Sequence, residues 1–509
     1  MPQPVNPHST APQDAYEHER LASLHPLGWR NPMPARRYDL VVVGGGTAGL
    51  TAAHAAATLG VKVALVERNL LGGNCLNIGC VPSKAIIRTS RLYAEMRDAE
   101  RYGALIPAGV DVDFAAVMQR MRGIRASISR TNSVERLTAA AIDVFFGQAT
   151  FTRSDALAVD GTTLRFRKAL IATGARPNIP SIPGLDETGF LTNTQLFDLT
   201  ALPPRLLVIG GGPLGCEMVQ AFCRFGARTT IVQDRPLFLP REERDAAQIL
   251  SDAFARDGVE VRLNTKVVNV HAEGGHKIVD LISDDYHNSI EVDAIVTGTG
   301  RVANVGGMDL EAAGVDYDAN GSVHVDDFLR TSNRRIYAAG DVCLEHKFND
   351  TAEASARIAV DNALRRGRRR LSALTVPWCT YTDPEVAHVG LYVRQARERG
   401  IPVKTFTIPM SDVDRAVADS ETTGFVKIHV RERSDRILGA TIVARHAGEM
   451  INEITLAMVA GIGLRTLGRV IHPYPTQAEA IEKAADAYNR SRIQRVAWPA
   501  RIWQRWRRR

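Results

Sequence analysis

The 509-residue chain contains no run of 18 apolar residues, the length that a membrane-spanning helix needs. It has only six cysteines, too few for a disulfide scaffold in a chain of this length. The first 37 residues lack the apolar core of a signal peptide and the acid-poor, arginine-rich face of a transit peptide. We therefore expect a cytoplasmic protein, in which a close cysteine pair is redox-active or metal-binding rather than structural.

The formal charge of +7 is confined to the C-terminus. From Ala487 onward there are no acidic residues and eight arginines, so the rest of the chain carries about −1 (7 − 8). No basic stripe extends over the body, which argues against a nucleic-acid partner. Residues 489–509 combine these arginines with Trp498, Trp503 and Trp506. Two interpretations stay open: contact with an anionic membrane surface, which Pro499 disfavours as one helix, or a solvated end.

Residues 38–67 have the pattern of a dinucleotide-binding β-α-β unit. Residues 38–43 are apolar except for Asp39, a pattern typical of a parallel strand buried on both faces. Gly44, Gly46 and Gly49 then fit the GxGxxG pattern, and an alanine-rich helix and a strand over 61–66 follow. Glu67 ends that strand and can accept hydrogen bonds from ribose hydroxyls, while the helix N-terminus faces the phosphates.

The pattern returns about 165 residues later. Gly210, Gly212 and Gly215 lie between an apolar run and a helix, and the next strand ends at Gln233. Two such units predict two dinucleotides with electron transfer between them. Three glycine turns, within residues 170–177, 295–301 and 336–342, support this prediction, and Asp341 in the last can reach a ribityl or phosphate-side hydroxyl.

From residue 376 the sequence changes to alternating, strand-like stretches followed by an apolar helix, without a dinucleotide signature. We therefore predict an α/β protein with two Rossmann-like dinucleotide-binding domains and a C-terminal α+β domain. The length of the chain agrees with about three domains.

The stretch GGNCLNIGCVPSK, residues 72–84, follows the first unit and holds two cysteines, Cys75 and Cys80. Gly79, Pro82 and Lys84 predict a loop that enters a helix. A helix N-terminus and a nearby lysine both lower the pKa of a thiol. A zinc site needs four ligands, and no second cysteine pair or HxxxH partner is present. A redox-cycling dithiol is therefore favoured over a metal site and a structural disulfide.

These motifs, with the ATG, GTGR and AAGDV segments, resemble those of the flavin-dependent pyridine nucleotide–disulfide oxidoreductases, such as lipoamide dehydrogenase, glutathione reductase and mercuric reductase. The resemblance covers residues 38–488. It implies FAD on the first unit, NAD(P)H on the second, and a homodimer with active sites shared across the interface. The implied segments are an N-terminal extension (1–37), the FAD domain (38–190 and 301–375), the NAD(P) domain (191–300), the dimerisation domain (376–488) and a basic tail (489–509).

The resemblance also implies roles for single residues. Cys80 would be the charge-transfer thiol against the flavin, and Cys75 the outward thiol that attacks the acceptor. Lys84 and Glu217 would pair near flavin N5. Besides the glycines of the two patterns, the implied FAD contacts are Glu67, Gly147, Thr173, Gly174, Asp341 and Thr351, and the implied NAD(P) contacts are Gln233, Arg235 and Gly300.

The sequence departs from this family near its C-terminus. In lipoamide dehydrogenase and glutathione reductase a histidine precedes a Pro-Thr pair, with a glutamate five residues later, and is the acid–base group. Here Tyr474 has that position, Glu479 keeps its place, and His472 lies two residues upstream. Phenol titrates near ~10 and imidazole near ~6.5, a gap of roughly 5 kcal/mol. Either His472 takes over the role, or the acceptor needs no proton transfer and Tyr474 hydrogen-bonds or adjoins it.

A tyrosine at this position resembles mercuric reductase, as do the TYTDPEVAHVG and DRAVADSETTGF stretches. That enzyme, however, passes its ion inward through a C-terminal cysteine pair, whereas the last cysteine here is Cys379. We therefore predict a mercuric-reductase-like flavoenzyme, without a metal cofactor, that reduces a disulfide or another thiol-reactive small molecule.

Dihydrolipoamide dehydrogenase and true mercuric reductase are alternatives of the same class. A low-turnover flavoprotein, redox-sensing or recruited to a membrane, is an alternative of another class. An acid at the end of the second strand favours NADH and arginines there favour NADPH. This chain has Gln233, Asp234, Arg235 and, further on, Arg241, and we predict NADPH.

Overall fold

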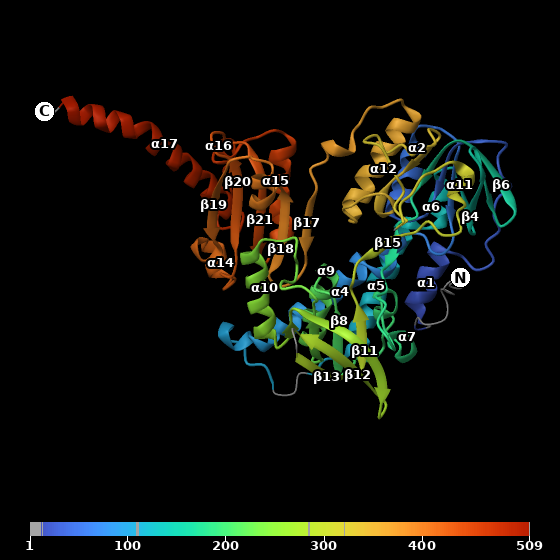
Figure 1. The fold of residues 1–509 in the computed structure, drawn as a ribbon, viewed down its shortest axis with the longest axis horizontal. Helices are drawn as coiled ribbons and strands as arrows, with labels where there is room; N and C mark the ends of the chain where they lie inside the picture. Colours follow the sequence, from blue (N-terminus) through green and yellow to red (C-terminus); the bar gives the residue numbers. More distant parts are fainter. Residues whose placement is uncertain (1–11, 13, 108–110, 284–285, 320, 508–509) are drawn as a thin grey trace. The chain divides into compact units, whose positions relative to one another are not determined.

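The computed structural model describes residues 12, 14–107, 111–283, 286–319 and 321–507, with side chains as far as residue 493. The chain divides into two compact units, residues 1–234 with 264–374 and residues 235–263 with 375–509 (Figure 1). Across the described residues, no helix combines the length and the apolar character that crossing a membrane requires. The segment boundaries predicted from the sequence stay predictions.

A seven-stranded sheet forms the centre of the first unit, in the order β3-β2-β1-β6-β5-β4 with β16 paired to β6. Strands β3, β2, β1, β6 and β16 are parallel, and β4 and β5 form an antiparallel extension of β6. The strands are β1 (Tyr38–Val43), β2 (Val63–Glu67), β3 (Ile142–Phe146), β4 (Ala149–Arg153), β5 (Ala156–Val159), β6 (Thr162–Ile171) and β16 (Ile336–Ala338). The predicted strand over 38–43 is therefore confirmed, whereas that over 61–66 begins two residues later.

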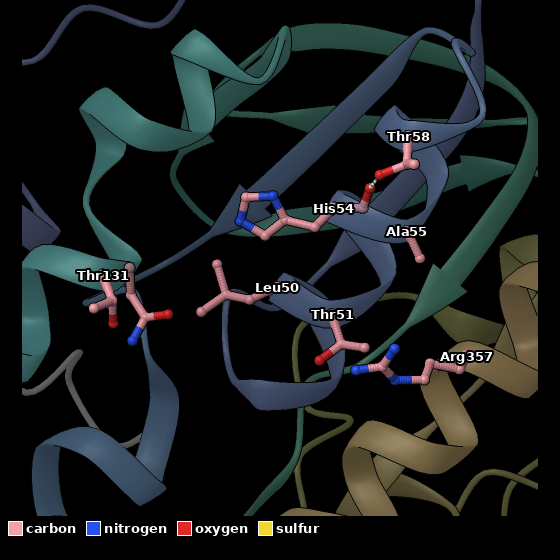
Figure 2. Close-up of a pocket in the computed structure, with 8 residues that line it drawn as sticks. Leu50, Thr51, His54, Ala55, Thr58, Thr131 and Arg357 are labelled. Carbon is pink, nitrogen blue, oxygen red and sulfur yellow. Dashed lines mark hydrogen bonds between the residues drawn. The ribbon is translucent and has the colours of Figure 1, made fainter.

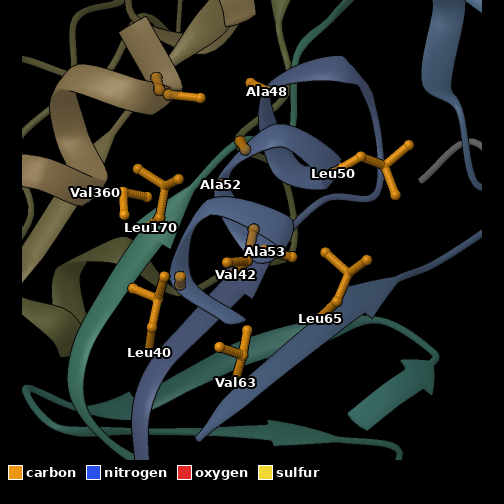
Figure 3. Close-up of a cluster of buried hydrophobic side chains, with 14 of the residues drawn as sticks. Leu40, Val42, Ala48, Leu50, Ala52, Ala53, Val63, Leu65, Leu170 and Val360 are labelled. Carbon is orange, nitrogen blue, oxygen red and sulfur yellow. The ribbon is translucent and has the colours of Figure 1, made fainter. Parts of the chain in front are cut away.

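Both faces of this sheet are buried, which explains why residues 40–43 of β1 are all apolar. Helices α2 (Thr47–Thr58) and α12 (Asn349–Leu364) cover one face (Figure 3). Ala52 and Ala53 of α2 are fully buried there, and their small side chains let the helix lie close to Leu40 and Val42 of β1. Val41, on the opposite face of β1, packs in a second cluster with residues of β4, β5 and the 303–342 segment.

A second Rossmann-like element follows in the same unit. Its strands β9, β8 and β14 pair in parallel, and a three-stranded antiparallel sheet, β11-β12-β13, packs beside them. The elements are β8 (Arg205–Ile209), α9 (Pro213–Arg224), β9 (Arg228–Val232), β11 (Thr265–Glu273), β12 (His276–Ser283), β13 (Tyr286–Val292) and β14 (Ala294–Thr297). Together with the first sheet, this arrangement confirms the two predicted dinucleotide-binding folds.

The other elements of the first unit are mostly helical. They are α1 (Ala15–Leu24), α3 (Gly73–Ile78), α4 (Cys80–Arg97), η1 (Ala99–Tyr102), α5 (Phe114–Ser129), η2 (Arg130–Asn132), α6 (Val134–Ala139), α7 (Leu185–Thr188), α8 (Asn193–Leu196), α11 (Leu310–Ala313), η3 (Gly340–Val342) and η4 (Leu371–Ala373), with the paired strands β7 (Ala175–Pro177) and β15 (Arg301–Ala303). Helix α1 packs beside α5 (Figure 1).

The second unit has the α+β fold predicted for the C-terminal domain. Its antiparallel sheet has the order β17-β18-β21-β20-β19. The elements are α10 (Arg244–Asp257), β10 (Glu260–Arg262), β17 (Pro377–Thr380), β18 (Glu385–Gly390), α13 (Val393–Glu398), β19 (Val403–Pro409), η5 (Met410–Asp412), α14 (Asp414–Ala418), β20 (Phe425–Arg431), β21 (Ile437–Ala444), α15 (Ala447–Val459), α16 (Leu464–Leu467) and α17 (Glu479–Arg507). Buried residues of α15 and α17 complete its core.

Helix α17 continues through Pro499, where the sequence disfavoured one helix. A proline inside a helix removes one hydrogen bond but does not always end the helix. The side chains of Trp498, Trp503 and Trp506 lie outside the described residues, so both interpretations of the tail stay predictions.

Candidate active site

The first glycine pattern folds tightly against the carboxyl end of the central sheet. Gly44 has a φ of +107°, and a Cβ there would lie 2.4 Å from the carbonyl oxygen of Ala172. A Cβ on Gly49 would lie 1.7 Å from the carbonyl oxygen of Gly44. A side chain at position 44 would push the loop away from Ala172, and one at position 49 would push α2 away from the loop. Gly46 caps the N-terminus of α2, so the loop offers the close backbone approach that a pyrophosphate needs.

Glu67 ends β2 and its carboxylate lies against this loop. Its Oε2 accepts a hydrogen bond from the Gly45 N–H at 2.6 Å, and its Oε1 accepts one from the Asn69 N–H at 2.8 Å. Burial raises the pKa of Glu67, and the two N–H donors counteract that shift. The carboxylate therefore fixes the loop, and its predicted contact with a ribose stays a prediction.

The second glycine pattern repeats this geometry with one chemical change. Gly210 has a φ of +109°, and a Cβ on Gly215 would lie 2.2 Å from the Gly210 carbonyl oxygen. Gln233 follows β9, and its Oε1 accepts a hydrogen bond from the Gly211 N–H at 2.9 Å. An uncharged amide thus occupies the place that a carboxylate has in the first pattern. Gly212 caps α9 as Gly46 caps α2.

The other predicted cofactor contacts lie at turns or helix starts. Gly147 follows β3 with a φ of +142°, and Gly174 follows β6 with a φ of +67°. Thr173 donates a hydrogen bond to the Asn304 carbonyl at 2.6 Å, and Thr351 donates one to the Phe348 carbonyl at 2.9 Å in the first turn of α12. Gly147, Thr173 and Gly174 therefore share the carboxyl edge of a parallel sheet, where such folds bind ligands.

The cysteine motif begins in direct contact with the first glycine loop. The Gly72 N–H donates a hydrogen bond to the Gly45 carbonyl at 2.8 Å. Gly73 has a φ of +58°, and a Cβ there would lie 2.6 Å from the Gly46 Cα. The two consecutive glycines therefore bring the start of α3 against the loop that would hold a dinucleotide.

Cys75 and Cys80 face each other across the break between two helices. Cys75 lies in α3, Cys80 is the first residue of α4, and their Sγ atoms are 2.7 Å apart. A Cβ on Gly79, between the helices, would lie 2.9 Å from the Asn74 carbonyl oxygen. The helix at Cys80 agrees with the prediction, but the sequence predicted a loop, and not α3, at Cys75. No side chain caps α3, so its sequence carries no local helix signal.

The two thiols have opposite pKa shifts. The hydrogen bond from Cys75 lowers the pKa of Cys80 to about 7, and the positive charge of Lys84 adds to this effect while burial opposes it. The same hydrogen bond, together with burial, raises the pKa of Cys75 well above its usual range. Cys80 is therefore the sulfur that ionises first, and Cys75 keeps its proton.

Lys84 lies one turn after Cys80 and forms an ion pair with Glu217 of α9. Its Nζ is 3.0 Å and 2.9 Å from the two carboxylate oxygens. The Glu217 side chain is 3% exposed, so this carboxylate has little access to water. The structure thus brings Lys84 and Glu217 together as the sequence predicted, and places the pair beside Cys80.

Asp341 forms an ion pair that the sequence analysis missed. Its Oδ2 lies 2.7 Å from Nη1 of Arg301. Burial raises the pKa of Asp341, and Arg301 counteracts that shift. The positive charge of Arg301 also lowers the pKa values of both Cys75 and Cys80. Arg301 follows Gly300 in the GTGR segment, so that motif could have identified it.

The predicted C-terminal site residues, Tyr474, His472 and Glu479, lie in the second unit and differ in exposure and in hydrogen-bond partner. Tyr474 is 73% exposed, and its hydroxyl donates a hydrogen bond to Asp414 Oδ2 at 2.9 Å. This bond raises the pKa of Tyr474, so even less of the phenol is ionised at neutral pH than usual. The His472 side chain is 7% exposed, and its Nε2 lies 3.1 Å from Glu453 Oε1. Glu479 forms an ion pair with Lys483 at 2.9 Å.

A surface hollow of about 450 Å³ lies elsewhere in the first unit, on the outer side of α2 (Figure 2). His54, Thr51 and Leu50 of α2 line it with Arg357 of α12. No predicted site residue lines this hollow. It is therefore separate from the dithiol. Within the described part of the chain, no group of three or more metal-ligating side chains was found.

Sequence comparison identifies the family. The model of the pyridine nucleotide-disulphide oxidoreductases matches residues 38–363, and the model of their dimerisation domain matches residues 376–485. This chain belongs to the pyridine nucleotide-disulphide oxidoreductase family. It is a FAD-dependent NAD(P)H oxidoreductase with a C-terminal dimerisation domain, which supports a homodimer.

The relatives include more than one activity. The chain is 33% identical to a mercuric reductase of Lysinibacillus sphaericus over 94% of its own length and 86% of that protein. It is also 33% identical to a dihydrolipoyl dehydrogenase of Thermus scotoductus over 90% of its length and 99% of that protein. Among solved structures, the HOCl-induced flavoprotein disulfide reductase RclA from Escherichia coli matches with a TM-score of 0.79 and 30% identity, covering 88% of this chain and 99% of RclA.

Proposed function

We propose that Cys75 and Cys80 are the redox-active pair through which this oxidoreductase reduces its acceptor. The observation that carries this proposal is the 2.7 Å contact between the two sulfur atoms, directly after the first glycine loop. A disulfide bond is about 2.05 Å long, so the two sulfur atoms lie close enough to form one. The low pKa of Cys80 supplies the thiolate that disulfide exchange needs.

The residues of the first unit fit FAD. Glycines at positions 44, 46 and 49 leave room for a pyrophosphate, and Glu67, Thr173 and Asp341 lie at the edge where the rest of the cofactor would be held. FAD, when bound, supplies two-electron transfer between a nicotinamide and a disulfide. The protein contributes the cysteine pair, the Lys84–Glu217 ion pair and the Arg301–Asp341 ion pair.

The cysteine pair can carry out the acceptor step by disulfide exchange. Two electrons and one proton convert the Cys75–Cys80 disulfide to a Cys80 thiolate and a Cys75 thiol. Cys75 passes its proton to Cys80 across the 2.7 Å contact as its sulfur attacks a disulfide acceptor, and one thiolate leaves. Cys80 then loses that proton to solvent and attacks Cys75, which restores the disulfide and releases the second thiolate.

We infer that the acceptor is a small, thiol-reactive molecule whose reduction needs no imidazole. Tyr474 holds the place of the family's histidine, and its hydroxyl is already a donor to Asp414. His472 is turned toward Glu453 and is nearly buried. The Tyr474 phenol is therefore not arranged to take a proton from a thiol at neutral pH.

The dimerisation domain exposes several large apolar side chains. Leu456 and Val459 of α15 are each 67% exposed, and Ile471 is 93% exposed. Exposed apolar groups gathered on one domain are typical of a protein interface. We propose that a second copy of the chain covers them, and that each copy contributes residues near Tyr474 to the partner's dithiol site.

Two further proposals concern the nicotinamide donor and the C-terminal residues 489–509. Gln233, an amide in place of a carboxylate, removes a negative charge that would repel a 2′-phosphate, which supports NADPH as the donor. Arg235 opens the second unit, and its role stays a proposal. Contact of residues 489–509 with a membrane face rests on composition alone.

An acceptor screen tests the proposed function. Purified enzyme is assayed with NADPH and with NADH against lipoamide, glutathione disulfide, hypothiocyanous acid, quinones and Hg(II). We expect at least one thiol-reactive acceptor whose turnover falls by at least ~10²-fold in Cys75→Ser, because the attacking sulfur is lost. The matched control is Cys379→Ser, which removes a cysteine of the other unit and should retain activity. If the Cys75→Ser variant reduced every acceptor as fast as the wild type does, the proposal would be contradicted.

The Lys84–Glu217 pair should affect Cys80 with opposite signs. Lys84→Met removes a positive charge that lowers the pKa of Cys80, so the thiolate fraction at pH 7 should fall. Glu217→Gln removes a negative charge that raises this pKa, so that fraction should rise. The rate at which iodoacetamide alkylates Cys80, measured by peptide mass spectrometry, should fall about two- to fivefold in Lys84→Met and rise by a similar factor in Glu217→Gln. If both substitutions changed the alkylation rate in the same direction, the two charges would not act on Cys80 directly.

A further inference from the structure

Helix α1 lies in the N-terminal extension, before the residues that the family model matches. Its inward face is charged and buried, which is unusual for a surface helix. Glu17 is 1% exposed and Arg20 is 5% exposed. Asp14 caps the N-terminus of the helix, and its side chain accepts a hydrogen bond from the Glu17 N–H at 2.9 Å. Two arginines of α5 also face this helix.

Glu17 holds two arginines at once. Arg20 donates through Nε to Glu17 Oε2 at 2.9 Å, and Arg125 of α5 donates through Nη2 to the same oxygen at 3.1 Å. Arg125 is 1% exposed, and its burial lowers its pKa to about 10. Arg122, also on α5, bonds through Nε to Asp14 Oδ2 at 2.5 Å. The carboxylate of Glu17 is thus the shared counter-charge of two buried guanidinium groups.

Arg20 and Arg125 also form hydrogen bonds to Asn77, a residue of the cysteine motif. Arg20 donates through Nη1 to Asn77 Oδ1 at 2.6 Å, and Arg125 donates through Nη1 to the Asn77 carbonyl at 2.9 Å. The Asn77 amide in turn donates to the Leu71 carbonyl at 2.9 Å and the Gly73 carbonyl at 3.0 Å. Asn77 therefore connects α1 and α5 to both ends of helix α3.

Helix α3 depends on such outside contacts because it has little stability of its own. It has six residues, no side-chain cap, and glycines on both flanks. Isolated helices this short are not stable in water. Asn77 lies two residues after Cys75 and three before Cys80, so the contacts that fix Asn77 also set the relation between the two sulfur atoms.

We propose that α1 is a positioning element of the redox centre: Glu17, acting through Arg20 and Arg125, fixes Asn77 and thereby holds Cys75 within hydrogen-bond distance of Cys80. This role rests on the proposed function of the cysteine pair. It gives the N-terminal extension a part in the chemistry, although none of its residues touches a sulfur atom. Without Glu17, two buried guanidinium groups face each other without their shared counter-charge, and Asn77 loses its fixed donors.

The test compares Glu17→Gln and Arg20→Gln with Glu19→Gln in the full-length, FAD-loaded protein. Glu19 lies on the same helix and pairs with the exposed Arg130, so its variant is the matched control. In both test variants, alkylation of Cys80 by iodoacetamide at pH 7 should slow by at least ~threefold as the Cys75 bond is lost. The equilibrium constant for closing the Cys75–Cys80 disulfide should fall ~tenfold, which is about 30 mV in reduction potential.

Arg20→Gln keeps the Glu17–Arg125 ion pair, and so guards against a Glu17→Gln protein that fails to fold. If both variants lower the thermal midpoint but keep wild-type alkylation and potential, α1 only stabilises the fold and the positioning role is wrong. Slower alkylation and a smaller equilibrium constant in Glu19→Gln, as large as in the test variants, would also overturn the positioning role. A wild-type protein without a readily alkylated Cys80 would instead contradict the proposed function of the pair.

Discussion

Replacing Cys80 with serine is expected to abolish the long-wavelength absorbance that anaerobic NAD(P)H produces in the FAD-loaded protein. That absorbance requires a thiolate beside the flavin, and Cys80 is the sulfur whose pKa is lowered, to about 7. Cys75→Ser should keep the absorbance and lose turnover, because serine cannot attack the acceptor but can still donate a hydrogen bond to Cys80. An absorbance that is already absent in the wild type would exclude a dithiol next to the flavin.

The pH dependence of this absorbance follows from the same pair. A thiolate exists above its pKa, so the band of the wild type should be present at alkaline pH and disappear as the pH falls through about 7. Cys75→Ala removes the hydrogen bond that is the largest cause of the low pKa. The midpoint should then move upward toward the ~8.5 of an ordinary thiol, whereas Cys75→Ser should move it less. A midpoint that is unchanged in Cys75→Ala would assign the low pKa to Lys84 and the helix N-terminus.

The dinucleotide folds could be predicted because their signals are local. Residues 40–43 are apolar on both faces of the strand, and Gly49 is required by its contact with Gly44 within the same β-α-β unit. The position of Glu67 at the strand end follows from the same spacing. Because these constraints act between residues close in the sequence, they appear as a recognisable local pattern. The sheet and both glycine loops therefore agree with the sequence prediction.

The surroundings of the cysteines could not be predicted, because they depend on distant residues. Arg125 lies 108 positions from Glu17, and Lys84 lies 133 positions from Glu217. The second pair was identified only through the resemblance to the family. No such guide exists for Glu17 and Arg20. In the sequence they have the pattern of ordinary surface charges of a helix, but in the structure both are buried, Glu17 against Arg125 of α5 and Arg20 against Asn77 of α3.

Reduction of lipoamide and of glutathione disulfide by the wild type is expected to be slow, and Tyr474→His should accelerate dihydrolipoamide oxidation at least ~tenfold. A positioned acid–base group contributes 10²–10⁴-fold to such reactions, and a phenol bonded to Asp414 cannot act as one at neutral pH. An imidazole at this position would lie near Asp414 and Glu479, whose negative charges favour its protonated form and raise its pKa.

The pH profile separates a catalytic gain from a change in binding. A base works in its deprotonated form, so the rate of Tyr474→His should rise with pH through the pKa of the new imidazole, while the wild type shows no such step. Tyr474→Phe is the control that removes the hydroxyl without adding a base, and it should gain nothing.

His472 is the competing candidate, and the same assay decides between the two. If His472 served as the base, the wild type would turn over lipoamide quickly and His472→Gln would lose that activity. The structure argues against this, because the His472 imidazole is nearly buried beside Glu453. Fast wild-type turnover of lipoamide or glutathione disulfide would therefore overturn the account of Tyr474 and, with it, the class of acceptor proposed for this enzyme.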